Sequence, residues 1–142
     1  MPSSYLPRRA LRGVFLTLGL AACAPSTAGP ELSAPEAHQR AQAGQLTLVD
    51  IRRPDEWRQT GVVEGSRKLT FVDAHGRVNP NFLRSITAEV GMDDPVVLIC
   101  RSGNRTDTLA RQLVEHLGYT RVYNVEDGIR AWIADNLPVI RH

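Results

Sequence analysis

The chain has 142 residues, of which 42% are hydrophobic and 23% are charged. This length excludes two full-sized domains, and the composition is that of an ordinary globular protein with a hydrophobic core. The formal charge of +2 depends on Arg8, Arg9 and Arg12; without them 14 basic residues face 15 acidic ones, so neither nucleic acid nor an anionic membrane surface is expected as a partner.

The first 22 residues have the pattern of a bacterial export signal. The three arginines precede a short apolar run, residues 13–20, which cannot span a bilayer. Leu20-Ala-Ala-Cys23 follows and resembles the lipobox of bacterial lipoproteins. This resemblance implies that Cys23 is lipidated and becomes the first residue of the mature protein. An ordinary secretory signal with a chance cysteine remains the alternative.

These patterns predict three segments: a signal peptide over residues 1–22, a lipid-anchored tether over 23–32 and a folded domain over 33–142. The tether region is rich in proline, serine and alanine, as flexible linkers often are. Ala24, and not an aspartate, follows the cysteine, so retention in the inner membrane is not signalled. We expect a periplasm-facing protein of the cell envelope, held in the outer membrane by its lipid alone.

Helix and strand patterns alternate along the predicted domain. Helical patterns, marked by capping residues or by apolar residues at helical spacing, cover 33–43, 54–59, 81–90, 104–117 and 129–136. Mostly apolar runs, typical of buried parallel strands, cover 46–51, 67–72, 96–100 and 120–125. Because helices alternate with strands, the predicted fold class is α/β with a central, mainly parallel sheet.

The strongest chemical signal is Cys100, which ends the apolar run 96–100 and precedes Arg101-Ser-Gly-Asn-Arg105. The two arginines, the N–H groups of this loop and the N-terminus of the following helix would stabilise a thiolate or a bound anion. Gly103 permits the tight turn that such a site needs. The pattern predicts a cysteine nucleophile acting on a small anion, and the alternative is an inert buried cysteine.

Two further observations bear on this cysteine. The only other cysteine in the chain is Cys23, so a lipidated Cys23 would leave Cys100 without an intramolecular disulfide partner, which is unusual in an exported protein. Asp50 and Arg52 lie at the end of another predicted strand. Because parallel strands bring their carboxyl ends to one edge of the sheet, we expect these two side chains near Cys100 as supporting groups.

Cys100-Arg-Ser-Gly-Asn-Arg105 resembles the active-site loop of the rhodanese-like sulfurtransferases. Other matching segments, over about residues 33–140, are Leu48-Val-Asp-Ile-Arg52, Pro54-Asp-Glu-Trp57, Gly118-Tyr119, Val122-Tyr-Asn-Val125, Gly128, Trp132 and Leu137-Pro-Val139. The resemblance implies a single domain with a three-layer rhodanese-like fold, in which Cys100 accepts sulfur as a persulfide. It also implies that Arg101 and Arg105 steady an anionic donor while the backbone of Ser102, Gly103 and Asn104 holds the bound sulfur.

The spacing within this loop separates two kinds of chemistry. Four residues lie between Cys100 and Arg105, whereas cysteine phosphatases have one more residue there and hence a wider pocket. Thr106 occupies the phosphatase arginine position, and Ile99 stands where those enzymes carry histidine, so a phosphatase is disfavoured. One departure from the rhodanese pattern is Gly61-Val-Val-Glu-Gly-Ser66, which lacks the usual histidine and proline. The long segment 66–80 could shape a rim that selects the donor.

The remaining candidates are structural. Trp57 and Trp132 are expected to be packing aromatics. No metal-binding spacing is found among the four histidines, which are His38, His75, His116 and His142. We therefore expect neither a metal nor another cofactor.

The sequence thus predicts a sulfurtransferase that moves a sulfane sulfur from a small anion such as thiosulfate to a thiol or other nucleophilic acceptor. The alternative is a non-enzymatic sulfur carrier, sensor or protein-binding module.

Overall fold

The computed structural model describes residues 29–141. The predicted signal peptide, Cys23 and most of the tether lie outside the described residues. None of the helices in the described part is both long enough and apolar enough to cross a membrane.

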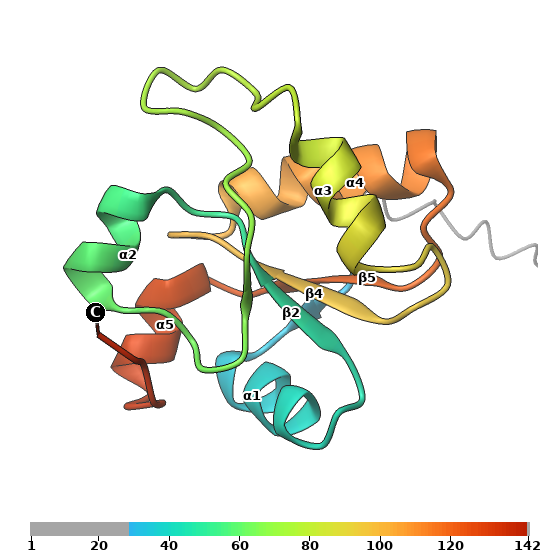
Figure 1. The fold of residues 1–142 in the computed structure, drawn as a ribbon. Coiled ribbons are helices and arrows are strands. Elements are labelled where there is room, and N and C mark those ends of the chain that lie inside the picture. Colours follow the sequence, from blue (N-terminus) through green and yellow to red (C-terminus); the bar gives the residue numbers. More distant parts are fainter. Residues whose placement is uncertain (1–28, 142) are drawn as a thin grey trace, which may run out of the picture.

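The described residues form one five-stranded sheet with helices on both faces (Figure 1). The strands lie in the order β1-β5-β4-β2-β3, and every neighbouring pair is parallel. The strands are β1 (Glu31–Leu32), β2 (Thr47–Asp50), β3 (Arg67–Lys68), β4 (Val96–Ile99) and β5 (Val122–Val125). The helices are α1 (Ala34–Gln42), α2 (Pro54–Thr60), α3 (Phe82–Glu89), α4 (Asn104–Leu117) and α5 (Gly128–Ala134). The predicted α/β fold class is confirmed.

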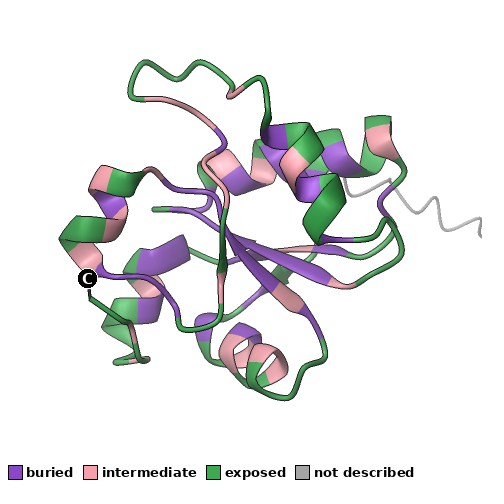
Figure 2. Ribbon diagram, in the orientation of Figure 1, coloured by how far each residue is buried: buried purple, intermediate pink, exposed green. Residues whose placement is uncertain are grey.

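The core has two halves, one on each face of the sheet. Helices α3 and α4 cover one face and α1 and α5 cover the other. Strand β4 is buried on both faces: Leu98 packs toward α3 and α4, and Val97 and Ile99 pack toward α1 and α5. Strand β4 is accordingly buried along its whole length (Figure 2), which explains why it is a continuous apolar run. Trp132 is fully buried in the α1–α5 half, whereas Trp57 is only partly buried and lies under the Lys68 ammonium.

Two predicted boundaries are wrong. Glu31 and Leu32, placed at the end of the tether, pair in parallel with Asn124 and Val125 as strand β1. Leu32 is buried against the α1–α5 half of the core, so the folded domain begins before residue 33. The strand expected over 67–72 is limited to Arg67–Lys68.

The chain after β3 forms the rim segment, which we define as residues 71–78. Phe71 N–H still donates to the carbonyl oxygen of Ile51 at 3.1 Å, but Val72 pairs in an antiparallel bridge with Val78. Between them Asp73 holds the turn, because its carboxylate accepts from the N–H groups of His75 and Arg77 and from the Arg77 side chain. The rim segment therefore folds back on itself as a small hairpin beside the sheet.

Candidate active site

The sulfur of Cys100 lies at the carboxyl end of β4, at the start of the loop that leads into α4. The residue is 1% exposed. Gly103 N–H donates to Sγ at 3.2 Å, and the Thr106 hydroxyl oxygen lies 3.5 Å from it. A backbone donor aimed at the sulfur and the N-terminus of a 14-residue helix beside it both favour negative charge at this point.

Two glycines make this geometry possible. Gly103 has φ +93°, a left-handed conformation that side chains disfavour, and it turns its N–H back toward Sγ. Gly128 begins α5 with φ +59°, and a Cβ there would lie 2.4 Å from the carbonyl oxygen of Cys100. The same carbonyl oxygen accepts from Ile129 N–H at 2.8 Å, so α5 and the cysteine loop are in direct backbone contact.

A buried polar network supports the loop from below. The Thr106 hydroxyl lies 2.7 Å from the carbonyl oxygen of Gly103 and also contacts the side-chain amide of Asn124. Asn124 in turn donates to the Glu31 carboxylate of β1 at 3.4 Å. Sequence reasoning gave Thr106 and Asn124 no role at this site. A polar residue inside the apolar strand 122–125 was the signal that could have found Asn124, because a buried amide needs a partner.

Asp50 and Arg52 form a fully buried ion pair, with Arg52 Nη2 2.7 Å from Asp50 Oδ2. The same guanidinium donates to the carbonyl oxygen of Gly61 at 2.9 Å and to the Thr60 hydroxyl at 2.7 Å. Asp50 ends β2, and Thr60 and Gly61 lie at the end of α2, so these bonds tie the ends of the two elements together. The structure thus gives Asp50 and Arg52 a supporting role, and Arg52 also lines a small cleft together with Arg101.

Arg105 is held by Glu56, a residue to which sequence reasoning assigned no role. Two hydrogen bonds of 2.6 and 2.9 Å join the guanidinium to the carboxylate, and Arg53 N–H donates to Glu56 at 3.0 Å. Burial would raise the pKa of Glu56, but the hydrogen bonds and charges of Arg105 and Arg53 outweigh it and lower this pKa below its ordinary value. The hydrogen bond to Glu56 raises the pKa of Arg105. The ion pair therefore fixes Arg105 beside the loop.

The other loop residues face different openings. Arg101 is exposed and lines a cleft of about 150 Å³ together with Arg52, Glu56 and Ile129. Ser102 is half-buried and lines a separate opening with Asp127 and Arg130. Among the charged loop side chains, Arg101 alone has no hydrogen-bond partner in the described part of the chain, and it is thus the arginine available to a bound anion.

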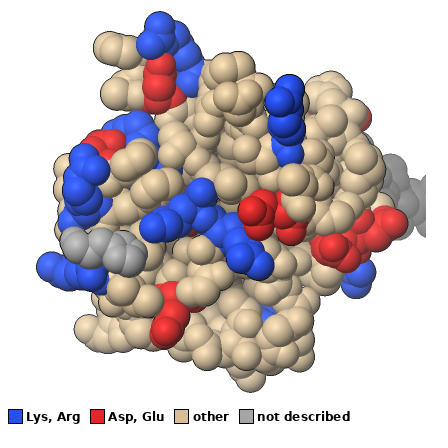
Figure 3. Space-filling view, viewed as in Figure 1, with Lys and Arg blue, Asp and Glu red and all other residues tan. Residues whose placement is uncertain are grey.

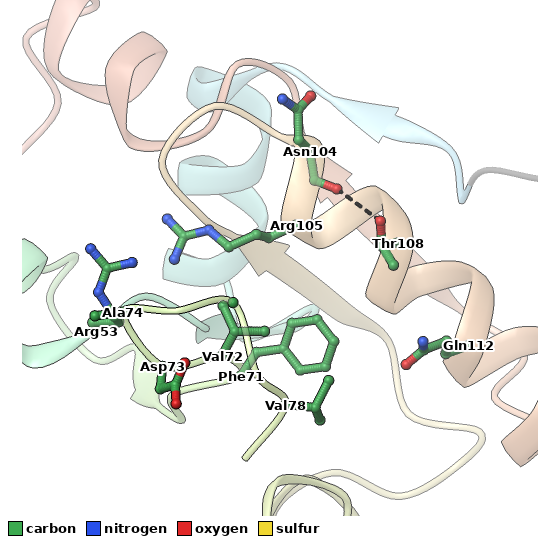
Figure 4. Close-up of a pocket in the computed structure, with 11 residues that line it drawn as sticks. Arg53, Phe71, Val72, Asp73, Ala74, Val78, Asn104, Arg105, Thr108 and Gln112 are labelled. Atoms are coloured by element: carbon green, nitrogen blue, oxygen red, sulfur yellow. Dashed lines mark hydrogen bonds between the residues drawn. The ribbon is translucent and has the colours of Figure 1, made fainter.

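The rim segment and α4 flank a larger cavity of about 510 Å³ that is open to solvent (Figure 4). We call it the rim cavity. Asn104 and Arg105 line it at the loop, so it adjoins the turn that holds the sulfur. Figure 3 shows basic and acidic side chains lying side by side on this face, without a single large patch of either sign. No group of three histidine, cysteine, aspartate or glutamate side chains within residues 29–141 is placed to hold a metal ion.

This fold and the cysteine loop define the rhodanese-like class, in which a strand-end cysteine sits in a tight loop before a helix. Residues 33–135 match the rhodanese-like domain, and the chain belongs to this family.

Similar proteins fit the same class. The chain is 32% identical over 105 residues to thiosulfate sulfurtransferase 16 of Arabidopsis thaliana, a match that covers 72% of this chain and 85% of the relative. An uncharacterized protein of Rickettsia prowazekii is 32% identical over 101 residues, covering 64% of this chain and 80% of that one.

Solved structures agree with the sequence relatives. A crystal structure from M. tuberculosis has a TM-score of 0.66 at 26% identity, covering 81% of this chain and 99% of that chain. The polysulfide-sulfur transferase homodimer of Wolinella succinogenes has a TM-score of 0.62 at 25% identity, with 80% of each chain covered. The predicted rhodanese-like fold is confirmed by these matches.

Proposed function

We propose that the protein is a sulfurtransferase that moves a sulfane sulfur through a persulfide on Cys100. The observation that carries this proposal is the sulfur itself: Sγ lies at a strand end, accepts from Gly103 N–H and is otherwise enclosed. A donor N–H beside the sulfur stabilises a thiolate, which is the reactive form of cysteine. It is equally placed to stabilise the negative charge of a persulfide.

The reaction has two steps. The Cys100 thiolate attacks the outer sulfur of a donor such as thiosulfate; the new S–S bond forms as the donor S–S bond breaks, and sulfite leaves with the electron pair. A nucleophilic acceptor then attacks the outer persulfide sulfur and releases Cys100 as thiolate. Two half-reactions through one covalent intermediate predict ping-pong kinetics. Arg101, exposed at the mouth of the loop, is the group we assign to the incoming anion.

Mass spectrometry tests this proposal directly. Purified protein treated with thiosulfate should gain the mass of one sulfur atom, and cyanide should remove that mass as thiocyanate. The Cys100→Ser variant should show no gain, whereas Cys23→Ala, which keeps the active-site thiol, should load like the wild type. A wild-type protein that gains no mass, or a Cys100→Ser variant that still does, would refute the enzymatic function.

We also propose that the protein is exported and anchored in the bacterial outer membrane by lipid on Cys23, facing the periplasm. The sequence pattern over residues 1–23 supports this proposal. Cells grown with a radioactive fatty acid should label the wild-type protein and not Cys23→Ala. Equal label in both proteins would contradict the anchor.

A further inference from the structure

One buried hydrogen bond at the cysteine can run in either direction. Cys100 Sγ and the Thr106 hydroxyl oxygen lie 3.5 Å apart, and either atom can be the donor. A hydroxyl that donates to the sulfur favours the thiolate, whereas a hydroxyl that accepts from S–H favours the thiol. Because Thr106 is fully buried, its other neighbours decide which of these two directions is possible.

Two carbonyl oxygens already compete for the single Thr106 proton. The carbonyl oxygen of Gly103 lies 2.7 Å from the hydroxyl, and Oδ1 of the Asn124 side chain contacts the same hydroxyl. While both groups are acceptors, the proton lies toward one of them and the hydroxyl has only lone pairs left for Sγ. If Asn124 turned its NH₂ group toward Thr106, the hydroxyl would accept from that nitrogen and be freer to donate to the sulfur. The orientation of the Asn124 amide is therefore the control point.

Glu31 fixes that orientation from the edge of the sheet. Asn124 Nδ2 donates to Glu31 Oε1 at 3.4 Å. An ionised carboxylate can only accept, so the NH₂ group must face Glu31 and the amide oxygen must face Thr106. Glu31 and Asn124 are register partners in the pairing of β1 with β5, which keeps the two side chains together. Within residues 29–141 the exposed Glu31 carboxylate has no other hydrogen-bond partner.

We propose that Glu31 is a positioning residue for the reactive cysteine. Through Asn124 and Thr106 it directs the hydrogen bond from Cys100 S–H to the Thr106 oxygen and holds part of Cys100 as the thiol. It thus opposes Gly103 N–H and the N-terminus of α4, which favour the thiolate. The inference rests on the proposed function only in treating Cys100 as the reacting group. Glu31 precedes residues 33–135, which match the family, so this control belongs to the chain's own first strand.

Titration of the thiol in the full-length protein tests the inference without a sulfur donor. In the Cys23→Ala background Cys100 is the only thiol, and the ultraviolet absorbance of its thiolate against pH gives the midpoint of ionisation. The same chain with Cys100→Ser is the blank. No reagent has to reach the buried sulfur. Arg105 on α4 and the Asp50–Arg52 pair, the charged groups beside the loop, are the same in every variant.

Two substitutions of Glu31 release the Asn124 amide. Glu31→Ala removes the acceptor, and Glu31→Lys replaces it with a donor that the amide oxygen must face. We expect the midpoint to fall by about half a pH unit in Glu31→Ala, which is about a threefold rise in the ratio of thiolate to thiol, and by at least as much in Glu31→Lys. Glu126→Ala, an exposed glutamate that directly follows β5, is the matched control and should leave the midpoint unchanged. A midpoint that stays or rises in both Glu31 variants would overturn the inference.

The rival explanation is a direct effect of the lost negative charge on the thiolate. In Thr106→Val no hydroxyl remains to be redirected, so adding Glu31→Ala there should cause no shift. In about 1 M salt the screening length is about 3 Å, and the shift caused by Glu31→Ala alone should persist. A shift that survives in Thr106→Val, or that disappears in salt, would assign the effect to charge and overturn the inference. The salt series decides the question even if Thr106→Val does not fold. A protein that shows the shift but never gains sulfur from thiosulfate would refute the proposed function alone.

Discussion

Glu56 controls where the Arg105 guanidinium can point. Its carboxylate is 9% exposed and accepts from Arg105, from Arg53 N–H and, at longer range, from the Arg53 side chain. Arg105 therefore has one fixed orientation: its side chain lines the rim cavity, and its partner Glu56 lines the smaller cleft together with Arg101. Arg105, which the sequence predicts to hold the donor, is thus already bound in an ion pair that separates two openings.

We expect Glu56→Gln to lower the free energy of unfolding by about 1–2 kcal/mol at pH 7, because it leaves the partly buried Arg105 without a countercharge. The folded-state pKa of Glu56 lies below its ordinary value, 4.5. Its stabilisation is therefore fully present above about pH 4.5 and is lost as the pH falls through the lower folded-state pKa. Urea unfolding at a series of pH values measures both effects.

The exposed Glu115→Gln is the control, and its stability should match the wild type at every pH. If the difference between wild type and Glu56→Gln stayed constant from neutral to strongly acidic pH, the ion pair would not be its cause.

At the scale of the element, the rim segment owes its shape to one carboxylate. Asp73 accepts three hydrogen bonds from its own turn, two from backbone N–H groups and one from Arg77 Nε. The backbone N–H of Arg77 is the main cause that lowers the pKa of Asp73, to about 2. An exposed hairpin held in this way remains ordered only while that carboxylate is charged.

Asp73→Ala should loosen the rim segment without unfolding the domain, since Phe71 remains bonded to β2. We expect faster hydrogen exchange at the backbone N–H groups of His75 and Arg77, because the carboxylate that accepts from both is removed. In the wild type, the protection should hold above pH 3.8 and be lost as the pH falls toward about 2. Asp135→Ala, another exposed aspartate, is the control and should leave the hydrogen exchange of the rim segment unchanged.

At the scale of the whole molecule, the buried Asp50–Arg52 pair joins β2, α2 and the segment after it. We expect Asp50→Ala to cost about 3–5 kcal/mol, because Arg52 would remain buried without a countercharge. This is a large part of the roughly 5–15 kcal/mol that stabilises a domain. The double variant Asp50→Ala/Arg52→Leu should recover part of the loss. Urea unfolding that places Asp50→Ala within experimental error of wild type would contradict the structural role.

The sequence predicted what depends on local pattern and missed what depends on distant partners. Strand β4 could be predicted because a strand buried on both faces must be continuously apolar. Strand β1 could not, because two residues carry no periodicity and become a strand only beside β5. The position of Cys100 before a glycine-containing turn was visible in the loop sequence. The pairing of Arg105 with Glu56 was not, because 49 positions separate them and the fold alone brings them together.

The enclosure of the Cys100 sulfur has a consequence for its lifetime as a free thiol. Exchange between a thiolate and a disulfide requires one disulfide sulfur to reach the attacking thiolate directly. Because Cys100 is only 1% exposed, a large disulfide has no such approach to Sγ, and we expect only a small anion to reach it. The depth of the site therefore acts as a size filter, which spares the thiol from capture in mixed disulfides even where its surroundings are oxidising.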